Sequence, residues 1–419
     1  MAVFRRLLTF DEAREAVRRE FEPRPLGVEE ISLLEGVGRV LAEEIVAALD
    51  IPPFSRSTVD GYAVRAEDTF GAGENRPIAL KVCGRVNIGE PPRMAVGRGE
   101  AAEIVTGAPM PEGADAVVML EYTERKSGEV FVFGAVAVDE NVMGAGSDIR
   151  KGETVLRVGE VLGSREIGVL AALGMARVKV YVVPRVVVLS TGHEVTELGE
   201  ELLPGRVYDI NAYSLSAAVV ESGGEPVCLG VFPDRLPVLR KAVRRGLACA
   251  DVVLTSGGVS VGPRDVMPKV LGLLGKPGIV VCGIAIKPGK PTTVAAVGGK
   301  LVFSLPGHPA SALLVFHLFV RPLIEAMAGR KAGEGLEVGA FAGMRLFAAR
   351  GRRTFVMVRL RRDGSGRLLA EPGPVSVSGA ISTLARADGF VEIPENVQFI
   401  DPGEMVRVRL FRNLDESVC

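Results

Sequence analysis

Histidine and tryptophan are scarce in this 419-residue sequence, which has no tryptophan and only three histidines, His193, His308 and His317. None of the histidines stands beside a cysteine or another histidine at the spacing of a zinc-binding motif. His308 and His317 are nine residues apart, so on one helix they would point to opposite faces. A transition-metal site built on histidine is therefore not expected.

Cysteine is also scarce, and a long apolar segment is lacking. The five cysteines include no CxxC pair and lie at positions 83, 228, 249, 282 and 419; such an odd, dispersed set predicts reduced thiols rather than a disulfide framework. No apolar segment follows Met1–Leu8, so no signal peptide is expected. The longest apolar stretch, Ala310–Val320, is too short to span a bilayer. These features predict a cytoplasmic protein without a membrane partner.

The composition is that of a protein with sizeable cores and no surplus of either charge. Apolar residues make up 47% of the chain and charged residues 24%, and the formal net charge is −1. This balance predicts a globular chain, and the length predicts two to four domains. Without a basic surplus, a nucleic-acid partner is not expected.

The pattern of apolar residues changes along the chain. Thr9 and Glu12 form a capping box for a first helix, and from Asp50 to Asp139 short apolar runs alternate with Gly and Pro, which predicts a β-rich module. From about Lys179 to Gly329, strands alternate with helices, which predicts an open α/β sheet. The helices of this region are expected to begin at Asn211, Asp234, Asp265 and His308, the last followed by Pro309. After Gly329, short strands predict a small β-barrel or sandwich.

Small and polar residues follow three of the predicted α/β strands, where ligands bind in open sheets. Glycine lets backbone N–H groups approach an anion closely, and the start of a helix adds a favourable dipole. Three such loops in one domain favour an anion site, although neither a P-loop nor a GxGxxG turn is present. The loop residues expected to contact a ligand are Ser190, Thr191, Gly192, Ser256, Gly257, Gly258, Pro306, Gly307 and Pro309.

Two further sets of charged residues complement these loops. Lys287-Pro288-Gly289-Lys290-Pro291 is a stiff loop with two ammonium groups, which predicts preorganised positive charge for an anion. Carboxylates at turns and strand ends can hold a hard cation such as Mg²⁺ beside a phosphate. The candidates are Asp60, Asp148, Glu194, Asp234 and Asp265, although helix capping alone would also explain Asp234 and Asp265.

Seven ordered motifs together resemble the molybdopterin molybdenumtransferases, the family of the bacterial MoeA proteins and the gephyrin E domain. The segment Asp60–Arg65 is similar to the family's DGYAVR, and Thr106–Val118 to its TGAPxPxGADAVV. The other five are Gly146–Arg150 (GxDIR), Ser190–Glu194 (STGxE), Thr255–Gly262 (SGGVSVG), Lys287–Pro291 (KPGKP) and Leu305–Pro309 (LPGxP).

The resemblance implies a multidomain α/β plus β fold with four domains. A small linking domain would comprise residues 1–50 and 140–177, and an inserted β-rich domain residues 51–139. A central, open α/β molybdopterin-binding domain would follow at 178–330, and a C-terminal β-barrel at 331–419. A homodimer is also implied, in which Asp60 and Thr106 act across the interface. Other proteins of cofactor biosynthesis are the further partners it suggests.

The implied reaction depends on Mg²⁺. Adenylylated molybdopterin binds, molybdate or tungstate attacks, AMP leaves, and the metal passes to the dithiolene sulfurs. The family's pattern gives catalytic roles to Asp60, Thr106, Asp148, Glu194, Asp234 and Asp265, with Glu194 and Asp265 as the first candidates for the cation. Lys287 and Lys290 would hold phosphate or molybdate, and Arg352 resembles an arginine of the family's C-terminal domain that faces the cleft.

Some positions depart from the family's pattern, and two rival functions remain open. His193, Gly283 and His308 stand where relatives often have Asp or Asn, Lys, and Asn. The α/β domain is also similar to that of molybdopterin adenylyltransferases, although the inserted β-rich domain argues against adenylation. A non-catalytic scaffold of the gephyrin type is the second rival. Nothing in the sequence separates molybdate from tungstate, because both are tetrahedral dianions.

Overall fold

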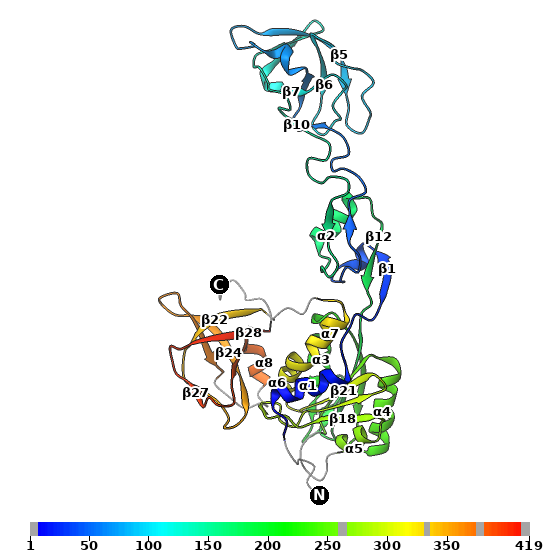
Figure 1. Ribbon diagram of the computed structural model, residues 1–419. Coiled ribbons are helices and arrows are strands. Elements are labelled where there is room, and N and C mark those ends of the chain that lie inside the picture. Colours follow the sequence, from blue (N-terminus) through cyan, green and yellow to red (C-terminus); the bar gives the residue numbers. More distant parts are fainter. Residues whose placement is uncertain (1–6, 259–265, 331–335, 374–380, 412–419) are drawn as a thin grey trace. The chain divides into compact units, whose positions relative to one another are not determined.

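The chain folds into two compact units in the computed structural model, which describes residues 7–258, 266–330, 336–373 and 381–411. One unit comprises Met1–Glu29, Gly38–Ala42 and Lys179–Cys419, and the other comprises Glu30–Val37 and Glu43–Val178. Both are drawn in Figure 1. We call them the α/β–barrel unit and the N-terminal β unit.

A six-stranded sheet forms the centre of the α/β–barrel unit, as the strand–helix alternation predicts. Its order is β16-β13-β17-β21-β20-β18. The strands are β13 (Arg185–Thr191), β16 (Glu225–Phe232), β17 (Val252–Ser256), β18 (Pro277–Cys282), β20 (Thr293–Val297) and β21 (Lys300–Leu305). The first four in this order are parallel, β20 runs antiparallel to β21, and β18 runs antiparallel to β20. Ser190 is level with Ser256, and Ser256 with Leu305, so three strands end side by side.

Helices cover both faces of this sheet (Figure 1). On one face, α1 (Phe10–Glu20), α3 (Ile210–Glu221), α6 (Pro309–Val315) and α7 (Arg321–Met327) share a core with the alternate residues Val188 and Leu254. On the other face, α4 (Leu236–Cys249) and α5 (Met267–Gly272) pack against Val187 and Val253. The capping box of α1 is confirmed, with Glu12 N donating to Thr9 Oγ1 at 3.2 Å and Thr9 N to Glu12 Oε2 at 2.8 Å.

Helices α6 and α7 are joined through a π-helical turn (Phe316–Val320) into one apolar helix of 19 residues, Pro309–Met327. By length and composition, it is one helix among the described residues that could cross a membrane. However, 67% of its apolar window is buried, and Phe316, Val320 and Ile324 belong to the core. The segment is therefore the central core helix of the unit.

The C-terminal strands close into a barrel, as predicted. The order β24-β25-β22-β28-β26 closes through an additional β24–β26 pairing. The strands are β22 (Glu337–Ala342), β24 (Arg353–Arg362), β25 (Leu368–Pro372), β26 (Gly389–Ile393) and β28 (Met405–Leu410). A short strand of the α/β region, β19 (Ile286–Lys287), pairs in parallel with the start of β24. The barrel is thereby hydrogen-bonded to the lysine loop, which begins at Lys287.

The N-terminal β unit contains a second six-stranded sheet, in the order β7-β4-β6-β5-β9-β8, which agrees with the predicted β-rich module. Its strands are β4 (Gly61–Val64), β5 (Ile78–Val86), β6 (Glu100–Ile104), β7 (Ala116–Met119), β8 (Thr123–Lys126) and β9 (Glu129–Val132). Two apolar clusters, around Tyr62 and Ala63 respectively, cover its two faces. The unit also contains two short strand pairs, β3 (Arg56–Ser57) with β10 (Val142–Met143) and β2 (Ile45–Val46) with β11 (Thr154–Leu156). The helix α2 (Ser164–Ala172) follows β11 along the chain.

Two of the predicted helix caps are wrong. Asp209, not Asn211, caps α3, and it accepts a hydrogen bond from Ala212 N at 3.0 Å. Arg235, not Asp234, is the N-cap of α4, without a side-chain hydrogen bond. Both predicted residues instead make contacts at the strand ends. His308 is the N-cap of α6, as predicted, whereas Asp265 lies outside the described residues.

A partly buried histidine, His317, gives this fold an acid sensitivity. His317 packs against Phe316 and Phe411, with ring centroids 5.8 and 4.9 Å away, and burial, with Arg321 nearby, lowers its pKa from 6.5 to about 4. Well above pH 6.5 the His317 imidazole is neutral in both the folded and the unfolded protein. Between pH 6.5 and about 4, only the imidazole of the unfolded protein gains a proton.

Between pH 7.5 and 5 the free energy of unfolding should therefore fall by roughly 1–2 kcal/mol because of this residue. His317→Leu should remove that part of the pH dependence in denaturant unfolding, whereas a variant of the exposed His193, His193→Gln, should keep it. Equal pH dependence in the wild type and His317→Leu would contradict the assignment.

Candidate functional site

One buried side chain, Asn211, joins the end of β17 to the loop after β21. Asn211, in the first turn of α3, donates its amide hydrogens to Ser256 Oγ at 2.6 Å and to the Gly307 carbonyl at 2.8 Å. Gly257 N also donates to the Leu305 carbonyl at 3.3 Å. Asn211 Oδ1 and Ser190 Oγ are buried, and neither has a hydrogen-bond partner among the residues that the structure describes. The floor of this site is thus polar and held together by one amide.

The loop after β13 is tied to the start of α4. Thr191 Oγ1 donates to the carboxylate of Asp234, and Gly192 N donates to the Phe232 carbonyl at 3.3 Å. Gly257 and Gly258, which follow β17, pack against Thr191 and Asp234. A Cβ at Gly257 would lie 2.2 Å from the Thr191 carbonyl oxygen, and one at Gly258 would lie 3.3 Å from Asp234 Oδ1. Both have positive φ, +94° and +64°, so only glycine permits this approach.

Glu194 follows the same loop and is exposed. A Cβ at Gly192 would lie 2.8 Å from Glu194 Oε2, so the missing side chain leaves room for this carboxylate. The neighbouring His193 is also exposed. Asp265, the other residue predicted to bind the cation, lies outside the described residues, as do Val259–Gly262 of the same motif.

A cavity of about 530 Å³ brings together the lysine loop, the loop after β21 and the barrel. A volume of this size is typical of small-molecule sites. Four residues predicted to contact a ligand line it: Lys287, Lys290, Pro306 and Arg352. His308 and Arg345 line it as well. The cavity therefore joins the two lysines of one loop with arginines of the barrel region.

The lysine loop is held from both sides. Lys287 pairs with Thr354 of the barrel, and Thr292 Oγ1 donates to the Gly289 carbonyl at 2.7 Å. Gly289 has φ +109°, and a Cβ there would lie 2.7 Å from Val315 and 2.8 Å from Ile286. These contacts fix the backbone between the two lysines. Among the residues that the structure describes, neither lysine has a carboxylate partner within ion-pair distance, so both charges are available to an anion.

Adjacent arginines at the start of β24 have different surroundings. Arg353 is bound by Asp11 at 2.8 Å, Glu395 at 3.0 Å and Glu392 at 3.4 Å, so its charge is neutralised. Arg352 lines the cavity and makes no such ion pair in the described part of the chain. Arg352 therefore has a charge available to the cavity, whereas Arg353 does not, and the binding role of Arg352 stays a prediction.

Two predicted site residues of the N-terminal β unit, Asp60 and Thr106, are hydrogen-bonded to each other. Asp60 Oδ1 accepts hydrogen bonds from Thr106 N at 2.7 Å and Thr106 Oγ1 at 2.9 Å, which hold the pKa of Asp60 below its ordinary value of 3.8. The exposed Asp148 belongs to the same unit, and its backbone N–H donates to the Ile51 carbonyl at 3.1 Å. The sequence motifs containing Asp60 and Thr106 therefore meet in space, as their predicted common role requires.

The carboxylates present suit a hard cation bound mainly by its substrate. Within the described ranges, no group of three or more His, Cys, Asp or Glu residues could hold a metal ion by itself. Asp234 and Glu194 nevertheless follow strands that are hydrogen-bonded neighbours, β16 and β13. Mg²⁺ is commonly held by one or two carboxylates plus the phosphates of a substrate. These carboxylate donors are therefore of the kind that Mg²⁺ binds, and Asp234 and Glu194 are the described residues that could hold it.

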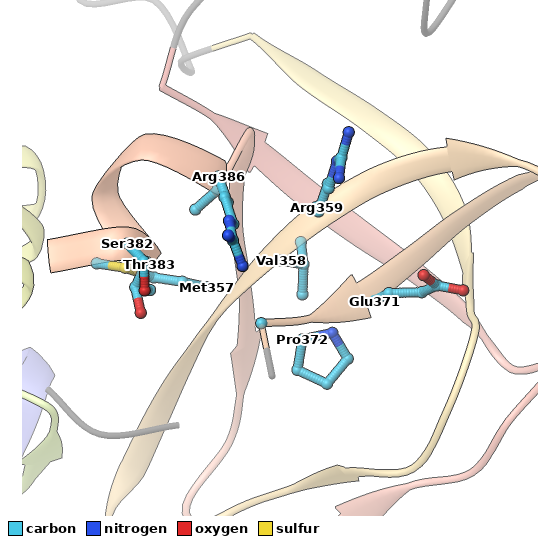
Figure 2. Close-up of a pocket in the computed structure, with 10 residues that line it drawn as sticks. Met357, Val358, Arg359, Glu371, Pro372, Ser382, Thr383 and Arg386 are labelled. Atoms are coloured by element: carbon cyan, nitrogen blue, oxygen red, sulfur yellow. The ribbon is translucent and has the colours of Figure 1, made fainter. Parts of the chain in front are cut away.

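A second cavity of about 390 Å³ lies between the barrel and α8 (Ile381–Arg386). Figure 2 shows the side chain of Arg386 between Thr383 and Val358, while the ends of Arg359 and Glu371 point away from it. Glu371 is also bound by Arg361 at 2.6 Å. The charged groups of this cavity do not converge, so it is not a second candidate site.

Sequence reasoning missed Asn211 and Arg345. Asn211 looked like a helix cap, because it stands at the start of an apolar helical pattern. Its contacts with Ser256 and Gly307 join residues 45 and 96 positions apart, which no local pattern reveals. Arg345 lies in an irregular segment before β23 (Leu346–Phe347), where its charge carried no motif.

Comparisons with known proteins cover almost the whole chain. Residues 8–174 match the MoeA N-terminal region (domain I and II), 188–326 match a probable molybdopterin binding domain, and 340–411 match the MoeA C-terminal region (domain IV). The molybdopterin molybdenumtransferase of Nostoc sp. is 34% identical over 90% of this chain and 87% of its own. That of Haemophilus influenzae is 33% identical over 97% of this chain and 100% of its own. A crystal structure of a molybdopterin biosynthesis MoeA protein from Pyrococcus horikoshii is 42% identical, with a TM-score of 0.85, and covers 98% of this chain and 100% of its own.

Loss of the Asn211 amide should loosen the convergence of the loops. Asn211→Ala leaves Ser256 and the Gly307 carbonyl without their donor, which should cost about 1–3 kcal/mol of stability and weaken binding of inorganic phosphate, used as an anion probe. Asn141→Ala is the matched control, because it also removes one amide donor, which bonds the Val117 carbonyl at 2.8 Å in the other unit. Calorimetric titration of both variants with phosphate is the measurement. Equal phosphate affinity in Asn211→Ala and the wild type would contradict the role of this side chain.

The Thr106 hydroxyl should control part of the acidity of Asp60. In Thr106→Val the backbone N–H remains and the hydroxyl is lost, so the pKa of Asp60 should rise toward 3.8 without reaching it. An NMR titration of the Asp60 carboxyl carbon measures this pKa directly. Thr123→Val serves as the control, since that hydroxyl donates to the Leu120 carbonyl. An unaltered pKa of Asp60 in Thr106→Val would show that the hydroxyl bond is not formed.

Proposed function

The chain belongs to the MoeA family of molybdopterin molybdenumtransferases, and from this premise we propose that it inserts molybdate into adenylylated molybdopterin with release of AMP. Membership makes it a transferase of molybdenum cofactor biosynthesis. The finer steps, including the adenylylated substrate and the departure of AMP, are part of the proposal. The observation that carries it is the cavity lined by Lys287, Lys290 and Arg352.

The cavity suits this chemistry because every reactant is an anion. Molybdate is a dianion and the substrate carries a phosphoanhydride, so their mutual repulsion opposes the reaction. Cations fixed in a concave site reduce that repulsion without reorganising during the reaction. Lys287 and Lys290 are proposed to hold the oxyanion or phosphate, and Arg352 to hold the same charge from the barrel side. Pro306, Gly307 and Pro309 shape the adjoining loop.

The loops at the ends of β13 and β17 are proposed to hold the phosphate-bearing part of the substrate. Ser190, Thr191, Gly192, Ser256, Gly257 and Gly258 form this surface, and Asn211 joins the β17 loop to the β21 loop. Glu194 and Asp265 are the proposed Mg²⁺ ligands, and Asp234 is a further candidate carboxylate. When bound, Mg²⁺ would neutralise charge on the phosphoanhydride and so favour departure of AMP. The hydrogen bond from Thr191 orients the Asp234 carboxylate.

A homodimer is the proposed working form, located in the cytoplasm. In this proposal Asp60, Thr106 and Asp148 of one subunit serve the cavity of the other. Support comes from the Asp60–Thr106 cluster, where the carboxylate stays ionised because two hydrogen bonds hold its pKa down. Tungstate has the same shape and charge as molybdate, and the described part of the chain carries no feature that separates the two substrates.

The test is AMP release from purified adenylylated molybdopterin with Mg²⁺, with molybdate and tungstate titrated separately. Lys290→Ala should lower the oxyanion-dependent rate by about 10²–10³-fold, since it removes a group that stabilises developing charge. Lys276→Ala is the matched control, because Lys276 is exposed, also precedes a proline, and does not line the cavity. It should leave the rate unchanged.

Two outcomes would contradict the proposal. A folded wild-type protein that releases no AMP with either oxyanion is not a transferase of this type. ATP-dependent adenylation of molybdopterin by the same preparation would then identify an adenylyltransferase, and the absence of both reactions would favour a scaffold. An oxyanion-dependent rate that is equal in Lys290→Ala and the wild type would place the reaction outside this cavity.

A further inference from the structure

Exposed apolar side chains line one part of the cationic cavity. Phe347 is 67% exposed and Met344 is 50% exposed, and both line the cavity together with Lys287, Lys290 and Arg352. A large aromatic side chain left in water costs free energy unless something covers it. In a concave site with a few fixed polar groups, a ligand is the expected cover.

The aromatic side chain is carried on a fixed backbone. Phe347 of β23 pairs with Phe399 of β27 (Phe399–Ile400), and Ala348 N donates to the Gln398 carbonyl at 2.8 Å. The guanidinium of Arg345 lies over the Phe399 ring, 4.7 Å from its centre. Arg345 is itself bound by Asp401 at 2.6 Å. This short antiparallel strand pair therefore holds Phe347 in place, and Asp401 neutralises the charge of Arg345.

The same segment fixes Phe347 relative to the cations. Ala349 N donates to Thr354 Oγ1 at 2.9 Å, and Thr354 pairs with Lys287 across β24 and β19. Arg352 lies between Ala349 and Thr354 in sequence, and its carbonyl accepts a hydrogen bond from Thr354 Oγ1 at 3.2 Å. The aromatic ring and the anion-binding groups thus belong to one hydrogen-bonded frame.

We propose that Phe347, with Met344 beside it, stacks on the flat nitrogen-containing ring of the phosphorylated substrate while Lys287, Lys290 and Arg352 hold its anionic part. This inference rests on the proposed function and assigns the ring-binding part of the cavity. Adenine and pterin share the chemistry that such a surface recognises, a flat π face joined to a phosphate. Phe347 is then a specificity-determining residue, because it distinguishes phosphorylated heteroaromatic compounds from bare oxyanions.

The test compares ring-bearing and ring-free anions on the full-length protein. Affinities for AMP, a phosphorylated pterin and inorganic phosphate are measured by calorimetric titration. Phe347→Ala should weaken binding of at least one ring compound by about tenfold, the value of one aromatic stack, and leave phosphate affinity unchanged. Phe347→Tyr keeps the ring and should retain the affinity. Met405→Ala removes another exposed side chain, 74% accessible, that does not line the cavity, and should have no effect.

The results also identify the ring. An effect on AMP alone assigns the surface to adenine, and an effect on the pterin alone assigns it to the pterin. Three results would overturn the inference: unchanged affinity for both ring compounds in Phe347→Ala, an equal loss of affinity for phosphate, or a changed oligomeric mass, which would show that Phe347 is covered by a second copy.

The inference and the proposed function fail separately. Oxyanion-dependent AMP release by the wild type, together with ring affinity independent of Phe347, would retain the function and discard the stacking surface. Ring affinity that depends on Phe347 in a protein without AMP release would do the reverse.

Discussion

Three parallel strands, β13, β17 and β21, end in register with one another, and the rest of the site depends on this register. Because Ser190, Ser256 and Leu305 are in register, the loops that follow begin side by side. The Asn211 amide then joins the end of β17 to the loop after β21. The Thr191–Asp234 hydrogen bond joins the end of β13 to the segment before α4. A shift of one strand would separate these partners, and the polar floor would lose its hydrogen bonds. The buried apolar faces of the sheet oppose such a shift, since it would place apolar side chains on the wrong side.

The second constraint is the pairing of β19 with β24, which connects the sheet domain to the barrel. Through it, Lys287 lies in register with Thr354, and Thr354 receives the hydrogen bond that fixes the segment carrying Phe347. The cavity can therefore combine lysines from one domain with Arg352 and an aromatic ring from the other. Arg353, one residue away, instead binds three carboxylates and lies over the Phe10 ring at 5.0 Å, so it stabilises the junction between α1 and the barrel.

Much of the fold could be predicted from local patterns, because those patterns have local causes. The Thr9–Glu12 capping box, the strand–helix alternation and the strand ends of the three loops all follow from residues near one another in sequence. The helix starts at Asn211 and Asp234 were wrong for the opposite reason. Each is a good capping residue, and in each case a partner distant in sequence takes the polar group instead.

The candidate site was predictable in its parts but not in its assembly. Motifs supplied Lys287, Lys290, Pro306 and Arg352, and the structure places all four around one cavity. Phe347 and Arg345 could not be found in this way, since an exposed phenylalanine and an arginine in an irregular segment match no pattern. Their significance comes from an antiparallel strand pairing between residues more than fifty positions apart. Asp265 stays a prediction from its motif.

The most direct test of the central claim, that the converging loops and the lysine loop form one oxyanion site, is to locate the oxyanion itself. Crystals of the protein grown with tungstate and AMP would show the tungsten by its anomalous scattering. The account predicts a peak in the cavity, within hydrogen-bond distance of Lys287 or Lys290, and no peak there in crystals of Lys287→Ala/Lys290→Ala. A tungsten peak elsewhere, with this cavity occupied only by solvent, would contradict it.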